Sequence, residues 1–195
     1  MKKLLLLLLL IPIYTSAQES DYVPNIQVDS ASRKIDFKGV VQVDGVSKEK
    51  IFMRARDWFT REFEVAKAIV VMDDISSGHL TARGNYFGNR KRGIITVNFP
   101  YGVTFTVDLH IKNGKYKYEI TDFVEIDGLN GQGLPDMHPS DRYVFDPKYR
   151  NKNGEFDSTA KERLYYVEGN ANNIIVQLKA ALATDKFDHP VESDF

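Results

Sequence analysis

The sequence predicts an α+β domain in which five antiparallel strands form one sheet and two helices pack on one of its faces, in the order β-α-β-β-β-β-α. Three observations lead to this prediction. Several stretches alternate apolar and polar residues, one segment near residue 55 carries apolar residues at helical spacing, and a second such segment lies near the C-terminus. Alternation with period two is typical of a strand with one buried face, and a spacing of three or four is typical of an amphipathic helix.

The first strand and the first helix follow each other directly. Residues 35–43 alternate in polarity, and Asp44-Gly45 ends that strand. Ser47 is placed to cap the helix that follows by accepting a hydrogen bond from an unpaired backbone N–H. The helix is expected over residues 48–66. An amphipathic helix must bury its apolar stripe, so we expect these side chains in the core: Phe52, Ala55, Phe59, Phe63 and Ala66.

Two further β-prone stretches precede the central hairpin. Residues 68–72 and 80–87 are expected to pair, because the turn residues Ser76-Ser77-Gly78 lie between them. The sequence leaves open whether residues 94–99 add a strand or run on irregularly. The basic run Arg90-Lys91-Arg92 reads as a solvated turn, with contact to an anionic envelope glycan or lipid as the alternative.

The central hairpin is predicted by the segment HIKNGKYKYEITDF, residues 110–123. Asn113-Gly114 is typical of a two-residue type I′ turn, in which both residues have positive φ. The resulting register pairs Ile111 with Tyr116, Leu109 with Tyr118, Val107 with Ile120 and Val103 with Val124 on the buried face. On the solvent face it pairs His110 with Lys117, Asp108 with Glu119, Thr106 with Thr121 and Thr104 with Phe123. Diagonal pairs, Asp108 with Lys117 and His110 with Glu119, are expected to offset the like-charge neighbours.

The remainder of the chain is a long connection and a second helix. Residues 128–158 are rich in Gly and Pro, and a polar connection of that length is either partly disordered or functional. Thr159 and Glu162 resemble a capping box that begins the helix. Gly169-Asn170 leaves open whether this helix is broken in two. The expected organisation is a signal peptide at 1–17, a polar leader at 18–34, the domain at 35–127, the loop at 128–158, a packed helix at 159–184 and a tail at 185–195.

The N-terminus has the pattern of a cleavable export signal. Lys2 and Lys3 precede an apolar run, and small residues lead up to cleavage near Ala17. The apolar run is about 11 residues long, whereas a membrane-spanning helix needs roughly 20. The chain has no cysteine, so it is not expected to be a lipoprotein. We therefore expect a periplasmic or secreted protein with no transmembrane segment after cleavage.

Composition excludes some classes of function. Without Lys2 and Lys3, 24 basic residues face 27 acidic ones, a formal charge of −3. Nucleic-acid-binding proteins normally concentrate basic charge on one face, so nucleic acid is not expected as a partner. With 43% apolar and 12% aromatic residues, the chain is expected to build a packed core.

The motifs of common enzymes and metal sites do not occur in the sequence. The four histidines share no ligand spacing, and we interpret them as scattered surface residues. Phosphate-binding loops, nucleophile elbows and dinucleotide fingerprints are also absent from the sequence. No catalytic residue, metal ligand or cofactor is therefore expected.

The segments FKGVVQVDGVSKEKIFMRARDWF, GHLTARGNYF and IKNGKYKYEITDF together resemble a family of exported bacterial proteins. This is a domain-of-unknown-function family with a TATA-binding-protein-like (TBP-like) fold. The resemblance covers residues 35–126 and implies the fold alone, because the family supplies no catalytic residues. The TATA-binding protein itself uses two tandem copies and apolar wedges on DNA. This chain has one copy, with Asp108 and Glu119 on the exposed face, so the resemblance does not imply DNA binding.

The expected function is a non-enzymatic binding or scaffolding module in the cell envelope. Helices on one side of the sheet leave its other face open. That face is the candidate binding surface for an unknown envelope protein, glycan or lipid, through Arg83, Thr106, His110, Lys117 and Glu119. The alternative is a small hydrolase or lyase with a site under the 128–158 loop, which would use Asp136, His138 and Asp141.

Overall fold

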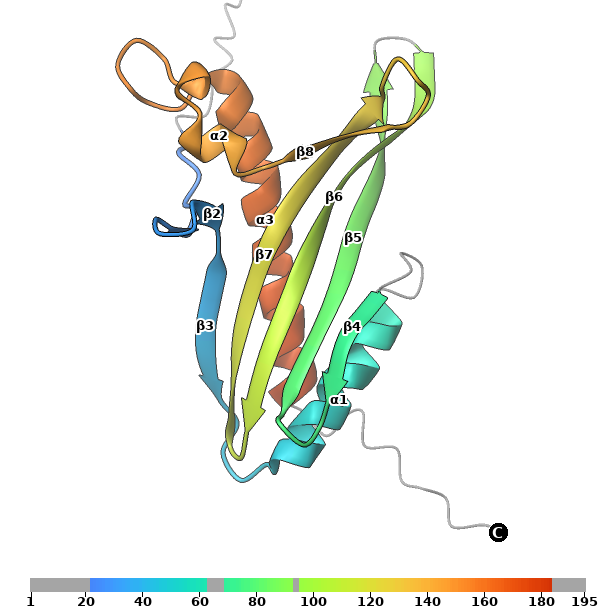
Figure 1. The fold of residues 1–195 in the computed structure, drawn as a ribbon, viewed down its shortest axis with the longest axis vertical. Helices are drawn as coiled ribbons and strands as arrows, with labels where there is room; N and C mark the ends of the chain where they lie inside the picture. The colour runs from blue at the N-terminus through green and yellow to red at the C-terminus, as the bar shows by residue number, and fades with distance from the viewer. Residues whose placement is uncertain (1–21, 63–68, 93–94, 184–195) are drawn as a thin grey trace, which may run out of the picture.

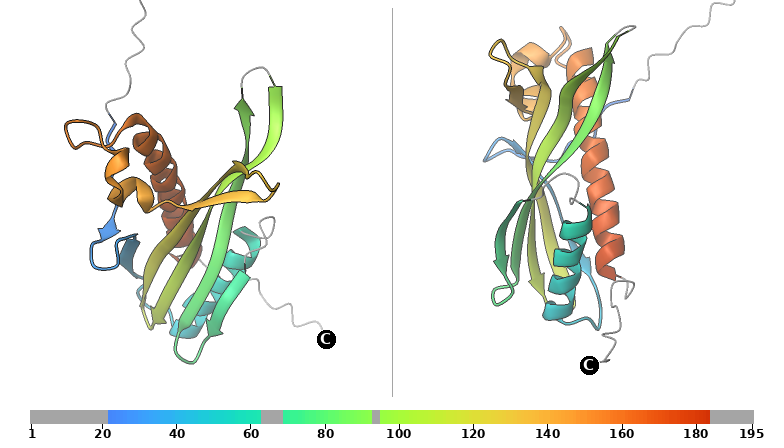
Figure 2. Two further views of the ribbon diagram at one scale, coloured as in Figure 1. Left: turned by 45° about the horizontal axis from the view of Figure 1, so that its top comes forward. Right: turned by 90° about the vertical axis from the view of Figure 1, so that its right-hand side faces the viewer.

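The computed structural model describes residues 22–62, 69–92 and 95–183 as one antiparallel sheet with two long helices packed against it. The helices α1 (Lys48–Glu62) and α3 (Ser158–Ala183) lie on the same face of the sheet (Figure 1). A view from the side shows the two layers, with the strands on one side and both helices on the other (Figure 2). The expected signal peptide (1–17), the tail (185–195) and the end of the first helix (63–66) lie outside the described residues.

The sheet contains six strands, one more than the sequence predicted. Five follow the order β3-β7-β6-β5-β4, and β8 pairs with β7. A separate two-stranded hairpin joins β1 to β2. The strands are β1 (Val28–Asp29), β2 (Lys34–Ile35), β3 (Phe37–Gln42), β4 (Ile69–Asp74), β5 (His79–Arg92), β6 (Ile95–Lys112), β7 (Lys115–Leu129) and β8 (Pro135–Pro139). The predicted α+β class and strand–helix order are confirmed.

The stretches that the sequence left unassigned around residue 94 belong to one long hairpin. Residues 95–99 form the start of β6, and the basic run at 90–92 belongs to the end of β5 rather than to a turn. Both strands therefore extend well beyond the part predicted from alternation. Their pairing fixes the register of β5 on β6 over most of their length.

The buried face of the sheet is the one that the alternation predicted. Ile111 pairs with Tyr116, Leu109 with Tyr118 and Val107 with Ile120. All of these side chains are buried, whereas His110 and Lys117 on the opposite face are exposed. The apolar side of α1 completes the core with Ile51, Phe52, Ala55, Trp58 and Phe59.

A β-bulge overturns the expected pairing at the far end of the β6–β7 hairpin. Thr106 pairs with Thr121, but the next pair is Thr104 with Val124 instead of the expected Thr104 with Phe123 and Val103 with Val124. Phe105 therefore lies opposite two residues, Asp122 and Phe123, and Asp122 has a φ of 53°. One extra residue reverses the alternation of side chains along the strand. Beyond the bulge, Phe123 and Glu125 consequently lie on the helix side.

The Asn113-Gly114 turn joins the expected strands but is not of type I′. Gly114 has a φ of 73°, and Asn113 is not among the residues with positive φ. The Asn113 side chain instead accepts a hydrogen bond from the backbone N–H of Lys48 at 2.8 Å, and Gly114 donates to the Val46 carbonyl. Docking on the start of α1 therefore decides the turn geometry. The predicted Ser47 cap is confirmed, since its Oγ accepts from the Lys50 N–H at 3.2 Å.

The C-terminal helix is continuous through Gly169-Asn170. Its cap is Asp157, whose carboxylate accepts from the Ala160 N–H at 2.7 Å, so the proposed capping box at Thr159 and Glu162 is not the device used. The end of this helix binds a buried charged side chain of α1. Arg54 is 3% exposed and donates from Nη1 to the Leu182 carbonyl at 2.9 Å. A guanidinium at a helix C-terminus satisfies a backbone acceptor and complements the helix dipole.

Regular structure occupies much of the range 128–158, which the sequence left as a loop. It holds β8, the short helix α2 (Arg142–Phe145) and the 3₁₀ turn η2 (Pro147–Tyr149). Tyr143 from α2 is buried against the main core. Among the described helices, none combines the length and the apolar character that crossing a membrane requires.

Candidate binding face of the sheet

One face of the sheet points away from α1 and α3 (Figure 2). This face carries polar side chains on three neighbouring strands. We call it the open face and define it by eight residues. They alternate with the buried residues along each strand, as the pleat requires. The open face comprises His79, Thr81 and Arg83 on β5, Thr106, Asp108 and His110 on β6, and Lys117 and Glu119 on β7.

The structure locates all five candidate residues from the sequence on this face. Arg83 pairs across the strands with Thr106, and His110 pairs with Lys117. Glu119 follows Lys117 on the same side of β7, and their charged groups are 3.0 Å apart. These residues span three adjacent strands, so they form one continuous surface. Its role in binding stays a prediction.

The charges of the open face pair differently from what the sequence predicted. Asp108 and Glu119 are direct cross-strand neighbours, as expected. Among the described residues, neither of the predicted diagonal pairs, Asp108 with Lys117 and His110 with Glu119, forms an ion pair. Glu119 pairs with Lys117, whereas Asp108 lies 2.7 Å from Nε2 of His79. Each carboxylate therefore has its own partner, which offsets the repulsion between them.

Two histidines that the sequence treated as scattered lie side by side on the open face. His79 and His110 are cross-strand partners, with ring centroids 4.4 Å apart and the planes inclined by only 19°. Thr81 supports the group, because its hydroxyl lies 3.2 Å from the Asp108 carboxylate. Sequence spacing missed this cluster, since the two histidines are brought together by the β5–β6 register. The sequence assigned no register between β5 and β6, because it left residues 94–99 unassigned.

Comparison with known proteins identifies the central part of the chain. Residues 37–125 match the family model described as a domain of unknown function (DUF4468) with TBP-like fold. This part of the chain is similar to the DUF4468 family. The resemblance of the three sequence segments to a domain-of-unknown-function family with a TBP-like fold is thereby confirmed. No curated protein matches the sequence.

Two solved structures share the fold of this protein. A DUF4468 family protein from Bacteroides ovatus is 13% identical, with a TM-score of 0.65 over 82% of this chain and 91% of that chain. A TBP-like protein from Parabacteroides distasonis is 11% identical, with a TM-score of 0.61 over 80% of this chain and 96% of that chain. The structural similarity establishes a common fold. At identities this low, it carries no information about ligands.

The residues of the alternative hydrolase site lie beyond the matched DUF4468 residues. Asp136 and His138 are neighbours on β8, with His138 Nε2 3.1 Å from the Asp136 carboxylate. Asp141 instead accepts a hydrogen bond from the Ile35 backbone N–H at 2.7 Å. Burial raises the pKa of Asp141, and that backbone bond acts in the opposite direction.

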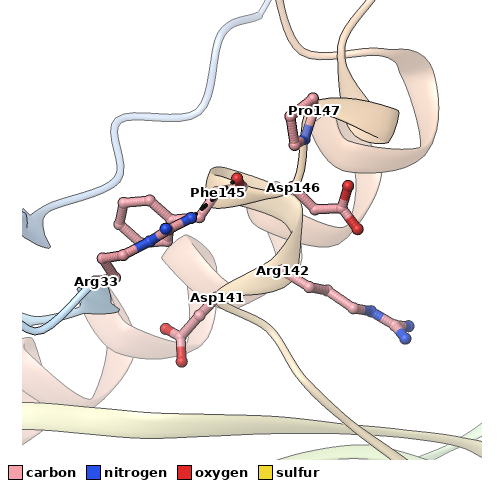
Figure 3. Close-up of a pocket in the computed structure, with 6 residues that line it drawn as sticks. All are labelled: Arg33, Asp141, Arg142, Phe145, Asp146 and Pro147. Carbon is pink, nitrogen blue, oxygen red and sulfur yellow. Dashed lines mark hydrogen bonds between the residues drawn. The ribbon is translucent and has the colours of Figure 1, made fainter.

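Asp141 lines a shallow cleft between β2 and α2 (Figure 3). The other two residues of the alternative site, Asp136 and His138, do not line this cleft. The cleft has a volume of about 370 Å³ and is lined by Arg33, Asp141, Arg142, Phe145, Asp146 and Pro147. Arg33 lies over the Phe145 ring at 5.3 Å and donates to the Phe145 carbonyl at 3.3 Å. Two polar side chains of the cleft thus connect α2 to the first hairpin.

Proposed function

We propose that this protein is an exported, non-enzymatic module that binds a component of the cell envelope through its open face. The observation that carries the proposal is the one-sided packing of the helices. Both long helices bury one face of the sheet and leave a polar surface of both charge signs on the other (Figure 2). Such a surface fits a polar partner through many hydrogen bonds and ion pairs, as at the rim of protein interfaces.

The chemistry of the open face supports binding in preference to catalysis. Asp108 and Glu119 are 30% and 33% exposed, so water reaches both carboxylates. General acid–base catalysis benefits from a group whose proton affinity is shifted by enclosure. The Asp108–Glu119 pair lies on an open sheet and has its charges offset by His79 and Lys117. A negative formal charge on the mature chain also argues against nucleic acid as the partner.

The export signal places the partner in the envelope under this proposal. Two lysines, an apolar run and the small residues before Gln18 form the pattern recognised by export and cleavage machinery. N-terminal sequencing of the protein recovered from its host tests this part directly. We expect a mature chain that begins near Gln18, in the periplasmic or culture fraction. Recovery of an uncleaved chain in the cytoplasm would refute export.

Site-specific crosslinking in the native envelope tests the binding surface. A photoreactive residue at Thr106 or Lys117 is compared with one at Val176 or Lys179 on α3. Val176 is 65% exposed, so a crosslinker there samples a surface outside the open face. We expect the same captured species from both open-face positions and its absence from both α3 positions. Equal capture from α3, or none from the open face, would refute the assignment.

Alanine substitution of the open face provides the matched measurement. Arg83→Ala, Lys117→Ala and Glu119→Ala remove exposed side chains, so they are expected to leave folding intact. Each is expected to reduce capture from Thr106. Asp136→Asn and Asp141→Asn test the alternative site and are expected to leave capture unchanged. Loss of capture only in those two variants would move the function to the 128–158 region.

A further inference from the structure

Three side chains with metal-binding atoms converge at one end of the open face. His79 begins β5, while Asp108 and His110 stand two residues apart on β6, so all three point to the same side of the sheet. One donor atom from each lies within 4.8 Å of the others. His79 Nε2 is 2.7 Å from Asp108 Oδ1, and His110 Nε2 is 3.9 Å from the same oxygen.

Backbone contacts hold the two histidine positions opposite each other. The Gly78 carbonyl accepts a hydrogen bond from the Ile111 N–H at 2.8 Å, directly beside the His79–His110 pair. A Cβ at Gly78 would lie 2.2 Å from the Ile111 carbonyl oxygen, so only glycine permits this approach. The sheet thus supplies a rigid base, whereas the side chains are 28%, 30% and 51% exposed for His79, Asp108 and His110. They therefore have room to adjust around an ion.

The donor distances are close to those of a three-ligand zinc site. Zinc bonds of about 2.0–2.2 Å in a tetrahedral arrangement place neighbouring ligand atoms roughly 3.3–3.5 Å apart. The His79–Asp108 separation is shorter than this range and the His110–Asp108 separation is slightly longer. Small rotations of exposed side chains bring both into it. A water molecule would complete the fourth position, as in other zinc sites with three protein ligands.

We propose that His79, Asp108 and His110 bind one divalent transition-metal ion, with Zn²⁺ as the expected ion. Binding of the metal at His79 Nε2 requires the tautomer that carries its proton on Nδ1, so Nδ1 takes up a proton as Nε2 gives one to the solvent, and the metal takes the place between His79 and Asp108. Two imidazoles with one carboxylate favour Zn²⁺, Ni²⁺ or Cu²⁺ and disfavour Ca²⁺ and Mg²⁺, which take oxygen ligands. The site needs no envelope partner, so it goes beyond the proposed function.

The surrounding charges suit a cation. Asp74 is the cross-strand neighbour of His79 on β4, and Glu119 is the cross-strand neighbour of Asp108 on β7. Lys117, which lies opposite His110, is paired with Glu119 at 3.0 Å. The Thr81 hydroxyl contacts both His79 and Asp108, at 3.1 and 3.2 Å. A hydrogen bond from outside the metal shell orients a ligand and typically strengthens its site.

Calorimetric titration of the purified protein with ZnCl₂ tests the site. We expect saturable binding of one Zn²⁺ per chain. His79→Gln and His110→Gln are each expected to weaken binding by at least about tenfold, because loss of an outer-shell partner alone costs that much in known sites. His138→Gln is the matched control, since His138 pairs with Asp136 on β8. Circular dichroism confirms that each variant is folded.

Nuclear magnetic resonance of the unmodified protein gives a second readout that needs no variant. Substoichiometric Cu²⁺ is expected to broaden the assigned imidazole resonances of His79 and His110 before those of the other two histidines. The proposal is overturned by the absence of saturable Zn²⁺ binding, by full binding in the His79→Gln/His110→Gln double variant, or by equal broadening of all four histidines. None of these results bears on envelope capture, because Thr106 and Lys117 are not metal ligands.

Discussion

Glu125 on β7 and Arg163 on α3 form a buried ion pair that joins the sheet to the C-terminal helix. Their side chains are 7% and 13% exposed. Glu125 also accepts a hydrogen bond from the Tyr143 hydroxyl, and Arg163 reaches Asp127 at 3.0 Å. Burial, together with the bond to Glu125, raises the pKa of Tyr143 to about 12. The bulge at Asp122 makes this cluster possible, because it turns Glu125 toward the helices.

Removal of Arg163 is expected to destabilise the fold strongly. Arg163→Met leaves the Glu125 carboxylate buried with Tyr143 and with Arg142, which is 3.6 Å away. Breaking a buried pair by removing one partner typically costs about 3–5 kcal/mol, and we expect about 3 kcal/mol because those two neighbours remain. The free energy of unfolding from urea denaturation measures this loss.

Lys34→Met is the control for that measurement. The Lys34–Asp122 pair is close, at 2.5 Å, but its side chains are 48% and 44% exposed. Exposed pairs contribute at most about 1 kcal/mol. If Arg163→Met costs no more than Lys34→Met, the buried pair does not join the sheet to α3 in the way described.

Gly78→Ala is expected to destabilise more than an alanine at another glycine with similar backbone geometry. Gly78 has a φ of 74°, and its added Cβ would meet the Ile111 carbonyl oxygen. Gly114 has a φ of 73°, but an added Cβ there meets no atom within 4 Å. A left-handed backbone costs a non-glycine residue about 1–2 kcal/mol, so Gly114→Ala should lose about that much. In thermal denaturation, the melting temperature of Gly78→Ala should be clearly lower than that of Gly114→Ala. Equal melting temperatures would contradict the close approach of Gly78 to the Ile111 carbonyl.

Asp74 is expected to remain ionised in acid. Hydrogen bonds from the side chains of Ser76 and Ser77 lower the pKa of Asp74 to about 2. Because this folded-state pKa lies below the ordinary aspartate value of 3.8, the carboxylate contributes stability that is present above about pH 4 and is lost as the pH falls toward 2. Carboxyl ¹³C shifts followed through a pH titration measure it. The pKa of Asp74 should rise in the Ser76→Ala/Ser77→Ala variant, and an unchanged low pKa in that variant would contradict the assigned cause.

The alternation of residues was enough to predict the strands and their faces wherever one strand stayed regular. Leu109 and Tyr118 are buried while His110 and Lys117 are exposed, as the hairpin register required. The prediction failed beyond Thr121, because the bulge adds a residue whose only sequence signal is an aspartate in a strand. It was also incomplete at the His79–His110 pair. His79 and His110 lie far apart in the chain and belong to no recognisable motif, so only the β5–β6 register brings them together.

By itself, the sequence determined the α+β class, the order of strands and helices, and which face of the central hairpin meets the helices. These properties follow from the periodicity of apolar residues, since each element must bury its own apolar side. Tertiary structure alone decided the turn at Asn113, the reversal of side chains that buries Glu125, and the meeting of the two histidines with Asp108. Each depends on which distant backbone a residue contacts, and a β-strand changes the face of every later side chain when its register shifts by one.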